Sequence, residues 1–509
     1  MGMRLGRLVV PAAVFAVVTF AFGFAQSAHA AGFGANDDTA KFMADGGKAY
    51  FAQMASVGLR QAVLTVRFSP SDPAEIDPTG RLDAAVRNAT AAGIRVVFAV
   101  YPYPPRQVQN GLSSPQAFAT WLTGVATRYP AVRQFSVMNE PNQPAFLRPQ
   151  FGRDRENISA ASAGAYLAAA YDALKTIDPA ITVIGVGLSP RGNDDARAPS
   201  NISTSPMRFL EALGRWYRAS GRTAPLMDGF SFHPYPVKAT DSLRRSYVWP
   251  NAGFADLDRV KQALWDAFDG TGQPTTVNGL KLYLDEVGWQ VDTQSLPGYT
   301  GRENVPVTDE ATQAAIYAQL VQAAACDSDI AQVNFFGFYD DPRRSGFQAG
   351  LYHADGTPRP SADAVRQAVS ETTLMGCGGI PAAWVPSAGV VGAGLGQGAG
   401  ERPPVAADTT LTLGVSAVVA EGARITAFVR RSNQPSSVVS TLLNGPGRTL
   451  APSLGAAATI PYGRATLTIG LPDGLAVGSY EIVVRFVAEA NNLRTTLIQG
   501  PSFRVTSSP

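Results

Sequence analysis

The sequence feature that most restricts the fold is an alternation of two kinds of segment over residues 31–375. Short apolar runs, rich in β-branched or aromatic residues, end in polar residues. Each is followed by a longer segment whose apolar residues recur at the spacing of a helix. Strands that alternate with helices form a parallel sheet, and eight units in about 350 residues favour a closed (β/α)₈ TIM barrel. An open, doubly wound sheet is the alternative, but it would need fewer units and a phosphate-binding loop.

The predicted barrel strands cover residues 32–36, 61–67, 94–100, 134–139, 181–187, 227–233, 280–286 and 331–339. The predicted helices cover residues 38–56, 81–92, 115–128, 159–176, 207–219, 256–268, 308–325 and 361–369. Several of these helices begin with Asp, Ser or Thr near the N-cap position, as helix starts commonly do.

The first thirty residues have the parts of a secretory signal peptide. Arg4 and Arg7 precede an uncharged apolar run, and residues 28–30 (Ala-His-Ala) form an A-x-A cleavage site. A retained membrane anchor is the alternative, but the apolar run is short for a membrane span. We therefore expect residues 1–30 to be removed and the protein to be secreted, to the cell envelope or the medium, without later contact with the membrane.

Charge and cysteine content exclude several classes of function. The chain has 42 basic and 40 acidic residues, and removal of Arg4 and Arg7 makes the two numbers equal, so no footprint for nucleic acid is visible. Two cysteines and three histidines make a zinc or multi-histidine centre hard to build, and we expect no metal or cofactor. Export would allow Cys326 and Cys377 to form a disulfide, the alternative being two buried thiols. A monomer is assumed.

The composition changes after the predicted barrel domain, which we place at residues 31–380. Residues 381–407 are rich in Gly, Ala and Pro and are predicted to form a linker. Residues 408–509 contain short alternating β runs separated by turn residues, which predicts an all-β sandwich of the immunoglobulin or fibronectin type. This last segment contains no Trp, so a structural or spacing role is favoured over a sugar-stacking surface.

Two glutamates follow strands on opposite sides of the predicted barrel. Glu140 ends the fourth strand in an Asn-Glu-Pro motif, and Glu286 ends the seventh in an Asp-Glu-Val-Gly-Trp segment. The functional residues of a (β/α)₈ barrel sit at the carboxyl ends of its strands, so the two carboxylates should face each other across one mouth. Glycoside hydrolysis needs such a pair, one to protonate the leaving oxygen and one to attack the anomeric carbon or activate water. Solvated or ion-paired loop acids are the alternative interpretation.

Three further polar residues lie at or just after the ends of predicted strands. His233 ends the sixth strand, and Tyr235 follows two residues later. A tyrosine hydroxyl can donate a hydrogen bond to a carboxylate nucleophile and keep it ionised. Arg67, at the end of the second strand, could act in the same way through its charge, or it could be an ordinary surface cation. His353 lies in a turn sequence and is predicted to be a loop residue.

Together these motifs resemble glycoside hydrolase clan A, the retaining (β/α)₈ glycosidases, over about residues 31–375. The Asn-Glu-Pro, His-x-Tyr and Glu-x-Gly-Trp motifs and the stretch 350–360 carry the resemblance, which is closest to families 5 and 39, including cellulase-like enzymes. It implies that Glu140 is the acid/base and Glu286 the nucleophile.

The resemblance also implies roles for the neighbouring residues: Asn139 would bind the sugar 2-hydroxyl, Tyr235 would hydrogen-bond to Glu286, and His233 would line the subsite where the bond is cut. Many clan members end strand eight with a Trp that forms the floor of this subsite, whereas residues 334–339 read NFFGFY here. The residues that could replace it are Phe336, Phe338 and Tyr339. Trp249 and Trp289 are other candidate platforms for the sugar, or they are packing residues.

The sequence thus predicts a secreted retaining glycosidase that cleaves O-glycosidic bonds in a β-linked polysaccharide or oligosaccharide by double displacement. The alternative is a non-catalytic carbohydrate-binding or cell-surface protein on the same scaffold. The distance between the carboxyl groups of Glu140 and Glu286 distinguishes the two, because about 5–5.5 Å is the separation in retaining enzymes. A separation far beyond about ten ångström would favour the binding protein.

The predicted linker generates a test of the domain organisation. A chain that ends near residue 382 keeps both cysteines, and we expect it to fold and to retain activity on a soluble substrate, because a Gly-rich linker has no apolar face with which to bind the barrel. Circular dichroism and activity measurements on this truncated chain check the expectation. Loss of the fold would mean that the C-terminal domain completes the barrel core.

Overall fold

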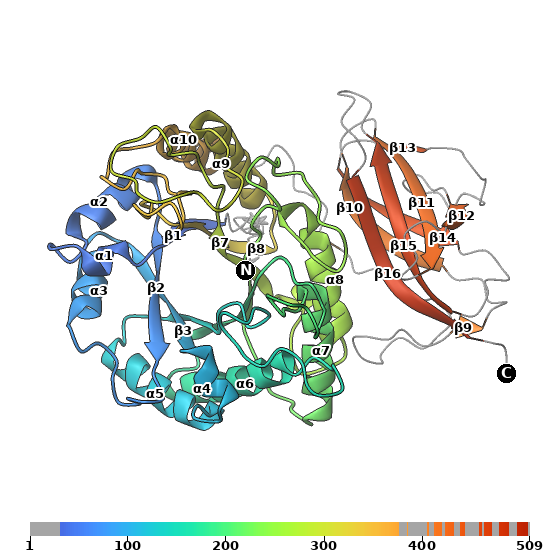
Figure 1. Ribbon diagram of the computed structural model, residues 1–509, viewed down its shortest axis with the longest axis horizontal. Helices are drawn as coiled ribbons and strands as arrows, with labels where there is room; N and C mark the ends of the chain where they lie inside the picture. Colours follow the sequence, from blue (N-terminus) through green and yellow to red (C-terminus); the bar gives the residue numbers. More distant parts are fainter. Residues whose placement is uncertain are drawn as a thin grey trace, which may run out of the picture.

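The barrel predicted from the alternating segments is confirmed. The structure, a computed structural model, describes residues 31–375 and Trp384, together with the backbone of β-strands between residues 405 and 506. Eight parallel strands, β1 to β8, pair in chain order and close between β8 and β1. Figure 1 shows these strands surrounded by the helices that connect them.

The barrel strands are β1 (Gly32–Asn36), β2 (Gln61–Phe68), β3 (Arg95–Pro102), β4 (Gln134–Val137), β5 (Thr182–Leu188), β6 (Gly229–Phe232), β7 (Lys281–Val287) and β8 (Ile330–Phe336). The helices are α1 (Thr39–Phe42), α2 (Lys48–Val57), α3 (Arg81–Ala91), α4 (Pro105–Gln109), α5 (Pro115–Arg128), α6 (Ser159–Ile177), α7 (Pro206–Ala219), α8 (Leu257–Phe268), α9 (Glu310–Ala325) and α10 (Pro360–Met375). Two short 3₁₀ helices are η1 (Phe254–Asp256) and η2 (Thr276–Asn278).

The first predicted helix is wrong in one respect, because residues 38–56 form two helices, α1 and α2, instead of one. Gly46 and Gly47 separate them with φ angles of 63° and 83°. These left-handed angles suit glycine and interrupt a helix. The short helix α4 was not predicted; it begins at Pro105, and proline is favoured in a first helical turn.

The core lies between the strands and the outer helices, and each helix buries one side. Helix α7 illustrates the rule: Phe209, Leu210, Leu213 and Tyr217 recur at helical spacing and are all buried. Burial of one such side chain contributes roughly 1.5–3 kcal/mol, so the packed helix layer is what holds the strand ends in fixed positions.

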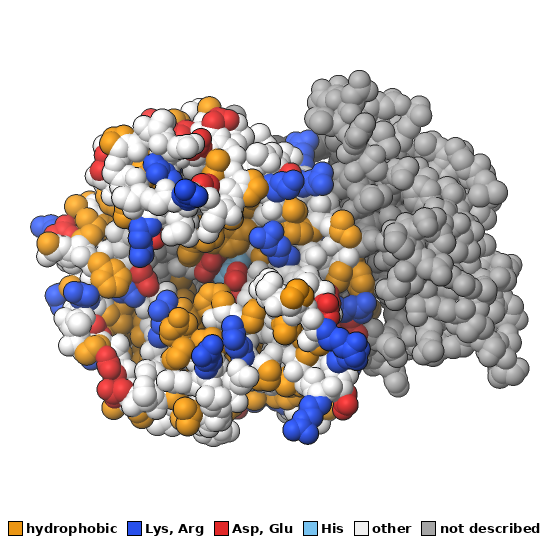
Figure 2. All heavy atoms as spheres, in the orientation of Figure 1, with side chains coloured by type: hydrophobic (Ala, Val, Ile, Leu, Met, Phe, Trp, Pro, Cys, Tyr) orange, Lys and Arg blue, Asp and Glu red, His pale blue; other side chains and the backbone are white. Residues whose placement is uncertain are grey.

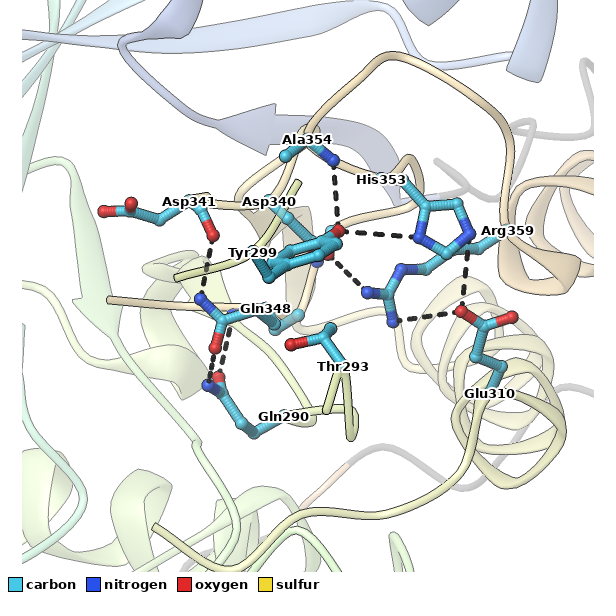
Figure 3. A network of polar contacts seen from close by, with 12 residues as sticks. Gln290, Thr293, Tyr299, Glu310, Asp340, Asp341, Gln348, His353, Ala354 and Arg359 are labelled. Carbon is cyan, nitrogen blue, oxygen red and sulfur yellow. Dashed lines mark hydrogen bonds and ion pairs between the residues drawn. The ribbon is translucent and has the colours of Figure 1, made fainter. Parts of the chain in front are cut away.

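A buried polar network joins the loops that follow β7 and β8 (Figure 3). Its centre is an ion pair between Arg359 and Asp340, whose side chains are both fully buried. Tyr299 from the β7–α9 loop donates its hydroxyl to Asp340 at 2.6 Å. His353 lies beside Tyr299 and within 3.4 Å of Glu310, in a loop as predicted. The two loops at this side of the barrel mouth are therefore fixed to each other.

Gln290 and Gln348 extend this connection. The Gln290 side chain donates to the Gln348 side chain at 2.6 Å and accepts a hydrogen bond from the Gln348 backbone at 3.0 Å. Both glutamines are buried, so the pair adds a second set of satisfied hydrogen bonds between the same two loops.

Several predictions concern residues that the structure does not describe. The signal peptide, most of the linker and Cys377 lie outside the described residues, so secretion and the disulfide stay predictions. Cys326 is the C-cap residue of α9. Among the described residues, no helix combines the length and the apolar character needed to cross a bilayer.

The C-terminal strands are β9 (Val405–Ala406), β10 (Thr412–Val419), β11 (Ala423–Arg431), β12 (Val438–Leu442), β13 (Ala458–Ile460), β14 (Gly463–Gly470), β15 (Gly478–Val487) and β16 (Thr496–Thr506). Strand β10 pairs with β14, and a second sheet has the order β12-β11-β15-β16-β9 with β13 also paired to β11. The side chains of these strands lie outside the described residues, so the predicted sandwich stays a prediction.

The buried ion pair generates a stability prediction. Asp340→Ala leaves the buried guanidinium of Arg359 with only the more distant carboxylate of Glu310, 3.8 Å away, and we expect a loss of up to about 3–5 kcal/mol in the free energy of unfolding. Arg366→Gln is the control, because its ion pair with Asp363 is exposed and should contribute at most about 0.5 kcal/mol. Urea unfolding of both variants measures the difference. Equal effects would show that the buried network does not stabilise the loops.

Candidate active site

The candidate site lies at the mouth of the barrel. Figure 2 shows a hollow on the face seen there, with acidic and histidine side chains at its bottom. One oxygen of Glu140, one oxygen of Glu286 and a ring nitrogen of His233 all lie within 4.8 Å of one another. The sequence prediction that Glu140 and Glu286 meet at one mouth therefore agrees with the geometry.

Glu140 is placed by an unusual backbone conformation after β4. Met138 and Glu140 have φ angles of 69° and 37°, in the left-handed region that residues with a side chain seldom adopt. The Glu140 backbone N–H donates to the carbonyl of Gly187 at 2.8 Å, and Asn142 bonds to the backbone of the loop after β5. These contacts hold a conformation that costs about 1–3 kcal/mol per residue and is typical of functional sites.

Glu286 stands above a polar layer inside the barrel. Its neighbour Asp285 is buried and accepts hydrogen bonds from Ser136 of β4 at 2.6 Å, Ser231 of β6 at 2.8 Å and Asn334 of β8 at 3.4 Å. Burial raises the pKa of Asp285, and the hydrogen bonds of the two serines oppose that rise. Asp285 thus connects strands from three parts of the barrel directly beneath the glutamate.

A register shift explains why the adjacent side chains of Asp285 and Glu286 both point inward, Asp285 into the barrel interior and Glu286 into its mouth. Side chains alternate along a regular strand, so the residue after an inward Asp285 would face the helices. The pairing of β7 with β8 shifts between Leu284 and Val287, which breaks this alternation. Glu286 accordingly reaches Tyr235 from the β6 loop and Asn36 at the end of β1.

The two oxygens of Glu286 have separate donors. The Tyr235 hydroxyl donates to Oε2 at 2.8 Å, and the Asn36 amide donates to Oε1 at 3.3 Å. Donors of this kind favour the ionised form of a carboxylate. Tyr235 is held in turn by Tyr247, whose hydroxyl donates to the Tyr235 carbonyl at 3.0 Å.

His233 lies between the two glutamates. Its Nδ1 is 3.1 Å from an oxygen of Glu140 and 3.6 Å from an oxygen of Glu286. Burial alone would lower the pKa of His233, but the charges of Glu286 and Glu140 outweigh this effect and raise it to about 9. The imidazole is therefore protonated at neutral pH; its Nδ1 donates a hydrogen bond to Glu140, and its charge acts on Glu286.

The environment of Glu286 opposes its ionisation and supports it at the same time. Burial raises the pKa of Glu286 to about 7, and the nearby Glu140 adds to the rise. The positive charge of His233 and the hydrogen bond from Tyr235 act in the other direction. The cluster can therefore take up or release a proton near neutral pH, as acid–base chemistry requires.

The carboxylate oxygens of Glu140 and Glu286 and the ring nitrogen of His233 are close enough together to ligate one divalent cation. A metal ligand must use a free lone pair, and a protonated imidazole has none. Because the pKa of His233 is raised to about 9, its positive charge opposes cation binding at neutral pH.

Arg67 occupies a different place from the one predicted. It lies at the end of β2 and is exposed, but its Nε donates to the hydroxyl of Tyr101 at 3.1 Å, not to Glu286. Its guanidinium lies 4.7 Å from the centre of the Tyr103 ring. No ion pair within residues 31–375 includes Arg67. Arg67 therefore makes no direct contact with Glu286 among the described residues, and both its effect through charge and its binding to the substrate stay predictions.

The two tryptophans are not equivalent. Trp289 is only 1% exposed, and its Nε1 donates to the carbonyl of Asp241 at 2.9 Å, so it cannot offer a ring face to a sugar. Its predicted role as a platform is wrong, because it packs in the core. Trp249 is half-buried, with the guanidinium of Arg208 at 4.4 Å from its ring centre. Its binding role stays a prediction, as does that of the half-buried Asn139.

Among the strand-eight aromatics, the structure favours Phe336. Phe338 is fully buried, and the hydroxyl of Tyr339 hydrogen-bonds to Gln53. The Phe336 ring lies 6.0 Å from that of Tyr235 and 5.0 Å from that of Phe347. Phe347, in the β8–α10 loop, is 46% exposed and completes an aromatic wall beside the Glu286 donor.

Sequence reasoning missed Asn36, Tyr101, Asp285 and Phe347. Asn36 ends β1 and Tyr101 is the last residue but one of β3, so the rule that polar residues at strand ends face the mouth would have identified them. Asp285 directly precedes Glu286, but nothing in the sequence indicates a bulge that allows both to point inward. The position of Phe347 depends on the conformation of a long loop.

Among known proteins, only solved structures show similarity to this chain. No family model and no curated protein matches the chain. Similar solved structures include a family 39 glycoside hydrolase from Bacteroides cellulosilyticus WH2, with 14% identity and a TM-score of 0.47 over 87% of this chain and 81% of that one. A GH39 β-xylosidase from Caulobacter crescentus has 14% identity and a TM-score of 0.43 over 87% and 96%.

A GH5_18 protein from Streptomyces cattleya has 15% identity and a TM-score of 0.45 over 68% of this chain and 82% of that one. All three TM-scores are below 0.5, so function has to be judged from the geometry of the two glutamates.

The raised pKa of His233 can be measured directly, because the chain has only three histidines, His29, His233 and His353. We expect its ring resonances to titrate with a midpoint near pH 9, where the stabilisation gained by its charge is lost. Glu286→Gln removes a negative charge that raises this pKa, so the midpoint should fall. Titration of the ¹⁵N-histidine-labelled protein, with His353→Gln for assignment, checks this. A midpoint that Glu286→Gln leaves unchanged would contradict the coupling.

Proposed function

We propose that this protein is a retaining glycoside hydrolase that cleaves a β-linked polysaccharide or oligosaccharide by double displacement. The observation that supports it most is the distance of no more than 4.8 Å between carboxylate oxygens of Glu140 and Glu286. Retaining enzymes hold their carboxyl groups about 5–5.5 Å apart, whereas inverting enzymes need about 6.5–9.5 Å to admit a water molecule. A non-catalytic sugar-binding protein would have no use for this arrangement.

In the first step, Glu286 attacks the anomeric carbon. Its two donors, Tyr235 and Asn36, keep the carboxylate ionised and fix its direction, so that little reorganisation is needed when the bond forms. Glu140 gives its proton to the leaving oxygen at the same time. The products of this step are a glycosyl ester on Glu286 and the released leaving group.

In the second step, water takes the place of the leaving group. The esterified Glu286 no longer carries a negative charge, so Glu140 is left as the carboxylate that accepts the proton of the attacking water. Protonated His233 remains beside Glu140 and stabilises this charge. Hydrolysis of the ester then releases the sugar with its original anomeric configuration, and Glu140 is protonated again.

The resemblance of the Asn-Glu-Pro, His-x-Tyr and Glu-x-Gly-Trp motifs to clan A supports the same roles. We further propose that the enzyme is exported, because residues 1–30 have the pattern of a secretory signal. A polymeric substrate suits an exported enzyme, and the exposed Phe347 beside the site offers a surface on which a sugar ring could stack.

Substitution of the two glutamates tests the assignment, because their roles predict different rescue. Glu286→Gln removes the nucleophile and should stop both steps. Glu140→Gln should reduce hydrolysis of unactivated substrates about 10²–10⁴-fold. An aryl glycoside with a good leaving group hardly needs protonation, so this variant should form the ester and then hydrolyse it slowly. Mass spectrometry should find the sugar on the peptide that contains Glu286.

Azide provides the second measurement. It needs no general base, so it should accelerate turnover by Glu140→Gln and yield a glycosyl azide with the configuration of the substrate. Glu211→Gln, on the outer helix α7, is the control and should retain normal activity. A label on another residue, or near-normal activity of both active-site variants, would refute the proposal.

A further inference from the structure

Arg67 is a cation beside the reaction centre for which the proposed mechanism has no use. Its Nε is occupied by the Tyr101 hydroxyl at 3.1 Å, and Tyr103 covers one face of the guanidinium at 4.7 Å. An arginine held in this way keeps its two terminal nitrogens in a fixed plane, the geometry that binds a carboxylate or sulfate through two hydrogen bonds.

The acidic residue Asp38 does not form an ion pair with Arg67. The charge of Asp38 acts on Arg67, but the Asp38 carboxylate is paired with Lys41 at 2.9 Å and accepts a hydrogen bond from the Thr65 backbone. Within residues 31–375, no carboxylate forms an ion pair with Arg67. The guanidinium is therefore exposed, oriented and available to a ligand from the mouth of the barrel.

Tyr101 connects Arg67 to the reacting carboxylates. It pairs with Arg67 across β2 and β3, and it is buried. Burial raises the pKa of Tyr101, the charge of Arg67 opposes the rise, and the charge of Glu286 adds to it. Arg67 and Tyr101 thus stand side by side near the carboxyl ends of β2 and β3, at the same mouth of the barrel as Glu286.

A second exposed arginine lies on the side of Glu140. Arg191 follows β5; its carbonyl accepts from the Gln143 side chain at 2.5 Å, and the Gln143 backbone N–H donates to the carbonyl of Glu140 at 2.8 Å. The Arg191 guanidinium is 3.5 Å from the carbonyl of Val237, close to the segment that carries Tyr235. No ion pair of the described residues includes it. Through Gln143 it is joined to the loop of Glu140, the residue that would protonate the leaving group.

We propose, on the basis of the proposed function, that the substrate is an acidic polysaccharide with a carboxylate or sulfate on the sugars at both sides of the cleaved bond. Arg67 binds the anionic group of the sugar that becomes attached to Glu286. Arg191 binds the anionic group of the sugar that leaves. The overall chain is close to neutral, so this selectivity would come from two local contacts and not from a general attraction.

Binding to matched pairs of polysaccharides tests the proposal. The full chain with Glu286→Gln, which cannot turn over, is presented with β-linked uronate polymers and their carboxyl-reduced forms, and with sulfated polymers and their desulfated forms. At least one acidic polymer should bind about 10-fold or more tightly than its neutral partner, and added NaCl should reduce the difference. The uronate and sulfate pairs distinguish the two anionic groups.

Second-site variants assign the contacts. Arg67→Gln and Arg191→Gln, each in the Glu286→Gln background, should lower affinity for the acidic polymer about 10-fold and leave affinity for its neutral partner within about twofold. Arg87→Gln, an exposed arginine on the outer helix α3, should change neither. Arg67→Lys should restore affinity only in part, because an ammonium cannot make the paired contact.

Three outcomes would overturn the proposal. They are tighter binding of the neutral polymer, equal affinity for both polymers of every pair, and no binding to any acidic polymer. These outcomes are separate from a failure of the proposed function. If the unmodified chain hydrolysed a neutral polymer with retention of configuration, the glycosidase proposal would stand and the acidic substrate would be excluded. If neither glutamate were needed for hydrolysis, the proposed function itself would fall.

Discussion

The buried carboxylate of Asp285 is the constraint on which the site depends. A charged group in the centre of a barrel is costly unless its oxygens are satisfied, and here Ser136, Ser231 and Asn334 satisfy them from three different strands. These contacts fix how the strands of the barrel are placed around β7. Glu286 is the next residue along the chain, so the same hydrogen bonds that stabilise the interior determine where the carboxylate of Glu286 stands.

Glu140 and Glu286 reach the mouth by different means. Glu140 stands on a left-handed backbone held by contacts to the loop after β5, whereas Glu286 stands on a strand whose register is shifted. Protonated His233 lies between them, and it compensates part of the repulsion between two acids at short range. Both local distortions cost stability, and both place a carboxylate where regular strands would not.

The barrel and its two glutamates could be predicted from sequence because their signals are local. Strands and helices differ in the spacing of apolar residues, and the end of each strand can be read directly, so Glu140, His233 and Glu286 could be assigned to one mouth. The burial of Trp289 could not be predicted from sequence, because it depends on contacts with Tyr317 and Asp241, which are remote in sequence. Phe347 and the partner of Arg67 likewise depend on how loops pack.

The network around Asp340 and Arg359 has a consequence for how such a protein can change over time. The loop between β8 and α10 contains Asp340, which anchors it in the core, and also Phe347, which forms part of the wall beside Tyr235. One segment therefore carries both a buried ion pair and part of the wall of the proposed site. Substitutions that reshape this loop would disturb the ion pair as well, so divergence in the shape of the site and in thermal stability should be linked here.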